Sequence, residues 1–165
     1  MSNTYFTQFE TTSYTKADAG DLPELSTGYE TGAEILDARI DAMFVEGFSP
    51  AAITASDVFA NLSSYYIVNY WPAAHYADPG HIPGAINYIP GESFTLATDL
   101  ETLPTDKTVV VYCYTGQTSA FMTAYLRTLG YQAKTLKFGG NGMIYDNMPA
   151  AKWSPLQQGY DYVTE

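Results

Sequence analysis

An apolar run, Thr108-Val109-Val110-Val111-Tyr112, is followed directly by a polar loop, Cys113-Tyr114-Thr115-Gly116-Gln117-Thr118. The run is almost unbroken, which predicts a strand buried on both faces, as in a parallel sheet. After the loop, residues Ser119 to Leu129 repeat with a helical period and end before Gly130, a natural helix stop. Strand, loop and helix in this order predict one unit of an α/β fold.

The rest of the chain alternates in the same way. Thr31, with Glu34 three residues later, predicts the start of a helix that ends near Gly47. The other expected elements are a short helix over 55–62 capped by Thr54 or Ser56, strands over 65–70, 85–88 and 132–137, a helix over 92–103 and a turn over 139–142. This order predicts a central parallel sheet flanked by helices on both faces.

The length of 165 residues and a hydrophobic fraction of 46% predict one globular domain. We expect this domain over residues 31–155, after a partly ordered polar N-terminal tail over 1–30 and before a C-terminal tail over 156–165. No run approaches the roughly 18 apolar residues of a membrane span, so no membrane span is expected.

The chain is acidic, with 18 acidic and 7 basic residues and a formal net charge of −11. Such a charge repels phosphate backbones, so nucleic acid is not an expected partner. Because no lysine or arginine lies between Arg39 and Lys107, any anion site must be built mainly from backbone. One cysteine excludes an internal disulfide, and two histidines give no cluster spaced like a zinc site.

Cys113 is placed where α/β sheets bind their ligands, beyond the carboxyl end of a strand. The N–H groups of its loop and the positive end of the following helix stabilise an anion there. A lone cysteine after an apolar strand is also commonly a buried packing residue. The loop containing Gly116 and the helix after it favour a functional cysteine.

Two stretches of the chain resemble the rhodanese family. They are Gly80-His81-Ile82-Pro83-Gly84-Ala85-Ile86-Asn87 and Val111-Tyr112-Cys113-Tyr114-Thr115-Gly116-Gln117-Thr118-Ser119, supported by Leu129-Gly130-Tyr131 and Phe138-Gly139-Gly140. The resemblance spans about residues 50–150 and implies a single-domain rhodanese-like fold. It also implies a sulfurtransferase that needs no metal or organic cofactor and that passes sulfur from a small donor to a thiol acceptor, either a small molecule or a protein. Cys113 would be the catalytic nucleophile that carries the sulfur as a persulfide, and the substrate-binding residues would be Tyr114, Thr115, Gly116, Gln117, Thr118 and Ser119.

The sequence departs from the family pattern at two places. Many members end the first core strand with Asp-x-Arg, where this chain has Asn69-Tyr70-Trp71, so a buried charge pair is absent. Thiosulfate-using relatives often carry basic residues at the second and third loop positions, where this chain has Tyr114 and Thr115. We therefore expect thiosulfate to be a poor donor. The sixth position, Thr118, matches the two-domain thiosulfate and mercaptopyruvate enzymes.

Three other functions can be weighed against the sequence. A phosphatase of this family needs a seven-residue loop ending in arginine, whereas here that position is Ser119 and the nearest arginine is Arg127. A catalytically weak binding or regulatory module is favoured by Asn69 and Trp71. A thiol redox sensor would need only an accessible, reactive Cys113.

The two histidines are expected to have structural roles. His81 lies in a Gly-Pro turn and is expected to bond backbone and fix that turn, while His75 near Asp78 is expected at the surface. The compartment is not specified by the sequence. The resemblance favours the periplasm or cell envelope, because similar stand-alone domains are frequently exported.

Overall fold

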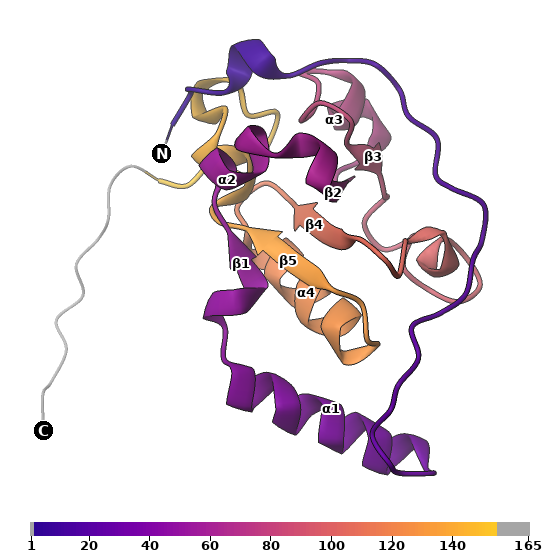
Figure 1. Cartoon of the computed structure of the whole chain (residues 1–165). Coiled ribbons are helices and arrows are strands. Elements are labelled where there is room, and N and C mark those ends of the chain that lie inside the picture. Colours follow the sequence, from indigo (N-terminus) through magenta and orange to yellow (C-terminus); the bar gives the residue numbers. More distant parts are fainter. Residues whose placement is uncertain (1, 155–165) are drawn as a thin grey trace, which may run out of the picture.

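A computed structural model describes residues 2–154 of the chain, and the expected tail over 156–165 lies outside the described residues. Five strands form one parallel sheet in the order β1-β5-β4-β2-β3 (Figure 1). Their bounds are β1 Ala52–Ile53, β2 Tyr65–Asn69, β3 Ile86–Asn87, β4 Thr108–Tyr112 and β5 Ala133–Leu136. The predicted parallel sheet is confirmed, and β4 lies in its middle.

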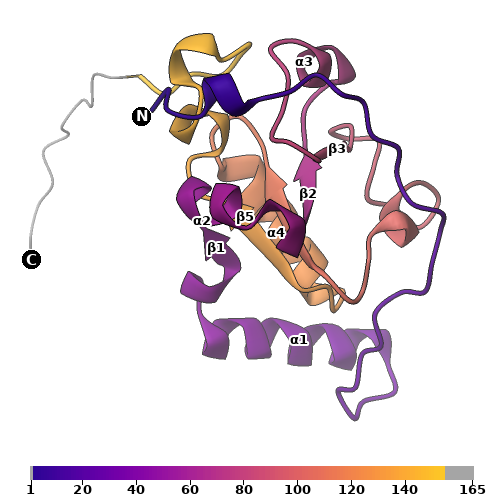
Figure 2. The same cartoon turned by 45° about the horizontal axis from the view of Figure 1, so that its top comes forward.

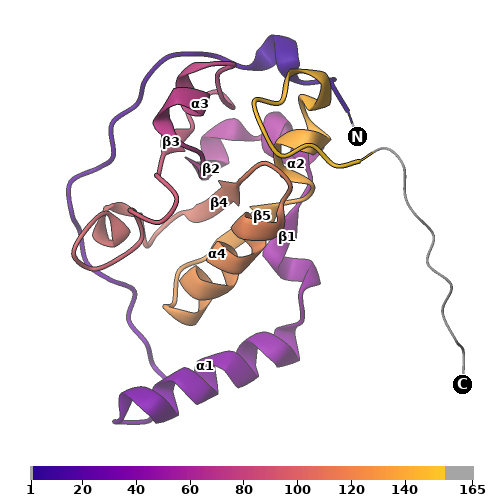
Figure 3. The ribbon, with the colours of Figure 1, turned by 180° about the vertical axis from the view of Figure 1, so that it is seen from behind.

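Four α-helices accompany the sheet: α1 Gly32–Glu46, α2 Ala55–Ala60, α3 Ala73–Ala77 and α4 Gln117–Thr128. Along β4, Val109 and Val111 pack with the α4 side chain Leu126, whereas Val110 packs with the α2 side chain Val58. Helices therefore cover both faces, as predicted, and Figure 3 shows α4 in front of the strands. No helix in the described part of the chain combines the length and the hydropathy needed to cross a membrane.

Two expected helix caps are present. The Thr31 hydroxyl accepts a hydrogen bond from Glu34 N at 3.4 Å at the start of α1. At the start of α2, the Thr54 hydroxyl accepts from Asp57 N at 3.2 Å, so Thr54 rather than Ser56 is the cap. Each cap satisfies an N–H that the helix itself leaves unpaired.

The expected helix over 92–103 is wrong. The segment is irregular and contains only a 3₁₀ turn, Leu100–Thr102. Phe94 has a left-handed φ of 74°, and the Ser93 hydroxyl accepts a hydrogen bond from Ile89 N at 3.1 Å. Local side-chain bonds of this kind compete with the helical ladder.

The N-terminal segment runs across the body of the domain (Figure 2). Ser2 N donates to Asn141 O at 3.2 Å, and Glu10 and His81 exchange two backbone hydrogen bonds of 2.9 Å. Further along, Gly20 N donates to Glu101 O at 2.8 Å. Most side chains of residues 11–30 are nevertheless exposed, so this segment is held by a few separate contacts.

Candidate active site

Cys113 occupies the junction between the end of β4 and the start of α4. Its side chain is only 3% exposed. The sulfur accepts hydrogen bonds from Gly116 N at 3.2 Å and from Ser119 N at 3.3 Å. Ser119 belongs to the first turn of α4, where the helix dipole is positive, so this arrangement stabilises a negative charge on sulfur.

Glycines allow one segment, residues 138–140, to approach the loop closely. Gly116 has a φ of 91°, and a Cβ there would lie 3.0 Å from Phe138 N. Gly139 has a φ of 52°, and a Cβ there would lie 2.3 Å from Cys113 O. Gly140 N donates to that same carbonyl at 2.9 Å. The turn over 139–142 is therefore a support for the Cys113 loop.

Asn141 and Trp153 hold the outer side of the loop. The Asn141 side-chain amide donates to Tyr114 O at 2.7 Å, and Trp153 Nε1 donates to Thr115 O at 3.3 Å. Trp153 N in turn donates to Asn141 Oδ1 at 2.8 Å. Neither residue was a candidate from the sequence, because both come from segments outside the loop and its motif.

The predicted site residues do not all face the sulfur. The Ser119 hydroxyl donates to Gly116 O at 3.1 Å and lies 2.8 Å from the Thr135 hydroxyl, so only the Ser119 backbone contacts Cys113. The Thr115 hydroxyl donates to the side-chain oxygen of Gln117 at 3.2 Å. Gln117 and Thr118 are exposed at the start of α4. In the described part of the chain, the N–H groups of Tyr114 and Thr115 have no acceptor and are free for a ligand.

The Tyr114 side chain lies between two aromatic neighbours. Its ring stacks on Trp71 with centroids 5.1 Å apart and planes 16° apart. Its hydroxyl lies 2.5 Å from Nδ1 of His75, which comes from α3. His75 was expected at the surface, but it is half-buried against the loop. Burial, and after it the charge of the Cys113 thiolate, raises the pKa of the Tyr114 phenol.

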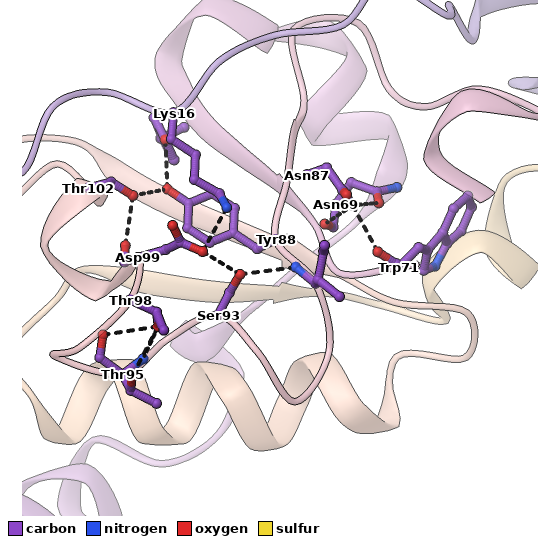
Figure 4. A network of polar contacts seen from close by, with 12 residues as sticks. Lys16, Asn69, Trp71, Asn87, Tyr88, Ser93, Thr95, Thr98, Asp99 and Thr102 are labelled. Carbon is purple, nitrogen blue, oxygen red and sulfur yellow. Dashed lines mark hydrogen bonds and ion pairs between the residues drawn. The ribbon is translucent and has the colours of Figure 1, made fainter. Parts of the chain in front are cut away.

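A neutral network replaces the Asp-x-Arg pair of the family pattern. Asn69 is fully buried and donates to the Tyr112 hydroxyl at 2.8 Å. Asn87 donates to Asn69 Oδ1 at 3.0 Å and to Trp71 O at 2.8 Å, as Figure 4 shows. Trp71 is fully buried, and its indole N–H has no partner among the described residues.

No lysine or arginine side chain among residues 2–154 donates a hydrogen bond to the loop over 113–119. Lys16 and Arg127 pair with carboxylates elsewhere, and the other bonds of these side chains go to backbone oxygens outside the loop. No group of three or more His, Cys, Asp or Glu side chains in the described chain could hold a metal ion. An anion bound at Cys113 would therefore be stabilised by backbone N–H groups, by the positive end of α4 and by the side chains of Tyr114 and His75.

Comparisons with known proteins agree with this fold. The family model of the rhodanese-like domain matches residues 21–142. A rhodanese-related protein from Thermoplasma volcanium is 26% identical, with a TM-score of 0.51 over 59% of this chain and 94% of that one. Reduced CoADR-RHD from Bacillus anthracis is 20% identical, with a TM-score of 0.52 over 67% of this chain and 20% of that one. No curated protein matches the chain.

Proposed function

The chain belongs to the rhodanese-like domain family, and from this premise we propose that it is a sulfurtransferase that carries sulfane sulfur on Cys113. The observation that supports this most directly is the pair of backbone N–H groups, from Gly116 and Ser119, that donate to the Cys113 sulfur. A thiol that only packs in a core does not need such donors, whereas a thiolate nucleophile does.

The proposed reaction has two displacement steps. The Cys113 thiolate attacks the outer sulfur of the donor, the bond from that sulfur to the rest of the donor breaks, and the leaving group departs with the electron pair. Cys113 is then a persulfide anion. An acceptor thiolate attacks its terminal sulfur, and the Cys113 thiolate leaves with the electron pair, which restores the enzyme. The free N–H groups of Tyr114 and Thr115 are suited to hold the terminal sulfur.

The test is intact-protein mass spectrometry after incubation with a sulfane-sulfur donor, followed by addition of a thiol. We expect a gain of one sulfur atom on Cys113 that the thiol removes, and no gain in Cys113→Ser, which should fold normally because the change is nearly isosteric. A sulfenate or mixed disulfide without persulfide would instead indicate a redox sensor. An unmodified Cys113 would indicate a binding module, and sulfur transfer by folded Cys113→Ser would exclude this site.

A further inference from the structure

The contact between His75 and Tyr114 joins two segments that lie far apart in the sequence. His75 lies on the short helix α3, and Tyr114 is the second residue of the Cys113 loop. Their side chains meet through the 2.5 Å separation of Nδ1 and the hydroxyl, and their rings pack edge to face with centroids 5.9 Å apart. Trp71 stacks on the tyrosine ring at 5.1 Å, so Tyr114 is held in this position.

The direction of this hydrogen bond depends on the tautomer of neutral His75 and on its protonation. A neutral Nδ1 without hydrogen accepts from the Tyr114 hydroxyl, which then cannot donate elsewhere. A protonated His75 donates from Nδ1 to the tyrosine oxygen, so the hydroxyl hydrogen becomes free to donate to another acceptor. Protonation therefore adds a positive charge beside the loop and, starting from the tautomer that accepts at Nδ1, also frees the Tyr114 O–H to donate. Histidine is the side chain whose charge changes between about pH 5 and pH 8.

The charge of Cys113 affects the ionisation of Tyr114. Besides burial, the Cys113 thiolate raises the pKa of the Tyr114 phenol. A negative charge on the Cys113 sulfur therefore interacts electrostatically with the Tyr114 hydroxyl. An anionic donor that approaches Cys113 enters the same electrostatic environment.

The ionisable side chains on α3 and next to the loop-contacting Trp153 are either exposed or bonded elsewhere. On its own helix, Tyr76 points into the core and donates to Ala85 O at 2.7 Å, and Asp78 at the helix end is exposed. Next to Trp153, which contacts the loop, Lys152 donates a hydrogen bond to Asp146 O at 3.0 Å. Within residues 2–154 no acidic side chain pairs with His75. His75 is thus a basic side chain that contacts the loop directly, through Tyr114.

We propose that His75, acting through Tyr114, determines which charge class of sulfur donor Cys113 accepts. Protonated His75 supplies the positive charge that the loop otherwise lacks and favours dianionic donors such as thiosulfate. Neutral His75 leaves a loop that favours donors with a smaller charge. This inference rests on the proposed sulfur transfer, but it concerns donor choice and has a readout that requires no transfer.

The kinetic test compares two donors that differ by one charge. Thiosulfate, a dianion, gives the Cys113 persulfide and sulfite; methanethiosulfonate, a monoanion, gives the same persulfide and methanesulfinate. The ratio of their kcat/KM values cancels the thiolate fraction of Cys113, because both reactions need it. We expect this ratio to rise about 10-fold in the wild type between about pH 8.5 and about pH 5.5. In His75→Gln it should change by less than about 2-fold, because glutamine stays neutral.

The second readout is alkylation of Cys113 by iodoacetate, an anion, relative to iodoacetamide, which is neutral. Their rate ratio should rise with acidity in the wild type and stay flat in His75→Gln. Tyr114→Phe keeps the ring stack but lacks the hydroxyl link, so its rise should be smaller. Tyr125→Phe is the matched control, since the Tyr125 hydroxyl bonds Phe94 O outside the loop, and it should behave like the wild type.

The outcomes separate the two proposals. A flat ratio in the wild type, or an equal rise in His75→Gln, would overturn the role of His75 while leaving sulfur transfer intact. A Cys113 that reacts with neither reagent and forms no persulfide would overturn both. A rise in the alkylation ratio without persulfide formation would support the His75 effect and overturn the sulfurtransferase.

Discussion

Gly139 lies against the backbone of the Cys113 loop in a left-handed conformation. A Cβ at this position would lie 2.3 Å from Cys113 O and 2.8 Å from Gly116 N. Because backbone atoms cannot move aside without displacing the loop, we expect Gly139→Ala to destabilise the domain by roughly 3 kcal/mol or more. We also expect it to slow persulfide formation. Urea unfolding and the mass-spectrometric assay measure the two effects.

Gly84→Ala is the control for backbone strain alone. Gly84 has a φ of 76°, but apart from its chain neighbours no atom lies within 4 Å of the position that a Cβ would take, so its substitution adds strain without a clash. We expect it to cost about 1–2 kcal/mol and to leave persulfide formation unchanged. Equal losses in the two variants would show that Gly139 is needed only for its conformation.

Thr115 is the loop position at which a permanent cation can be added without disturbing the Tyr114 stack. Its hydroxyl bonds only within the loop, to Gln117. A charge-assisted hydrogen bond contributes about 1.5–3 kcal/mol, so we expect Thr115→Lys to raise kcat/KM for thiosulfate by about 10-fold or more at pH 8. The gain should be smaller for methanethiosulfonate, which carries one charge less.

Thr115→Met, which has a side chain without charge, is the comparison for Thr115→Lys. It should show no gain with either donor. Thr115→Lys should also weaken the dependence of the donor ratio on pH, because its charge does not rely on His75. If wild-type protein already uses thiosulfate as well as methanethiosulfonate at pH 8, the neutral loop does not control donor choice.

Site residues could be predicted where the local sequence pattern alone fixes their position. Cys113 and Gly116 follow a buried strand and precede a helix, so their positions follow from local pattern. His75, Asn141 and Trp153 reach the loop from separate segments, and nothing in their own surroundings signals this. Their contribution depends on tertiary packing, which a single sequence does not display.

At the scale of elements, Arg39 is one of the side chains that join α1 to the end of α4, besides the ion pair between Glu46 and Arg127. Its guanidinium donates to Arg127 O at 2.6 Å and to Thr128 O at 3.3 Å. The positive charge lies at the negative end of the α4 dipole. No side chain of α1 is fully buried, so polar contacts of this kind have a large share in holding the helix.

We expect Arg39→Met to destabilise the domain by about 1–2 kcal/mol, because it removes two hydrogen bonds and a favourable helix-end charge. Equilibrium unfolding in urea measures this. Arg39→Lys should recover only part of the loss, since an ammonium does not reproduce the two-pronged guanidinium geometry. Full recovery by lysine would mean that charge alone matters, and an unchanged stability in Arg39→Met would show that α1 is held by other contacts.

Elements with strong local signals were predictable, and short or irregular ones were not. β4, α1 and α4 have a continuous apolar run or clear caps, and the structure confirms them. The five-residue helix α3 is too short to show a period and was not expected. The segment over 92–103 has apolar residues at helical spacing, but Phe94, Leu100 and Leu103 fill the core from an irregular backbone instead. Tertiary burial of these side chains overrides helix propensity there.

At the scale of the whole molecule, an ion pair joins the acidic N-terminal segment to the loop that follows β3. Lys16 Nζ donates to Asp99 Oδ2 at 2.7 Å, the Ser93 hydroxyl donates to the same oxygen at 2.6 Å, and Lys16 also lies over the Tyr88 ring (Figure 4). Burial acts to raise the pKa of the Asp99 carboxyl, but the hydrogen bonds from Lys16 and Ser93 and the Lys16 charge outweigh it. The pKa of Asp99 therefore lies below its ordinary value.

This lowered pKa sets the pH range in which the contact stabilises the fold. The folded state binds the Asp99 proton less readily than the unfolded state, so the stabilisation is complete above the unfolded value of about 3.9 and is lost as pH falls through the lower folded value. We expect Asp99→Asn to cost about 1 kcal/mol at pH 7, a modest figure because the pair is partly exposed. The difference from the wild type should shrink as the pH falls below the unfolded value of about 3.9, as measured by urea unfolding at pH 7 and at a series of lower pH values.

Asp106→Asn is the control for net charge. Asp106 is exposed and forms no ion pair among the described residues, so this variant changes the net charge of −11 by the same amount without breaking a contact. Because the molecule repels itself through its excess of carboxylates, removing an unpaired one should leave stability unchanged or slightly raised at pH 7. Opposite signs for Asp99→Asn and Asp106→Asn would show that the Lys16 contact outweighs the general relief of repulsion. An equal gain in both variants, or a cost of Asp99→Asn that does not shrink as the pH is lowered, would mean that the N-terminal segment is held by its backbone hydrogen bonds and not by this ion pair.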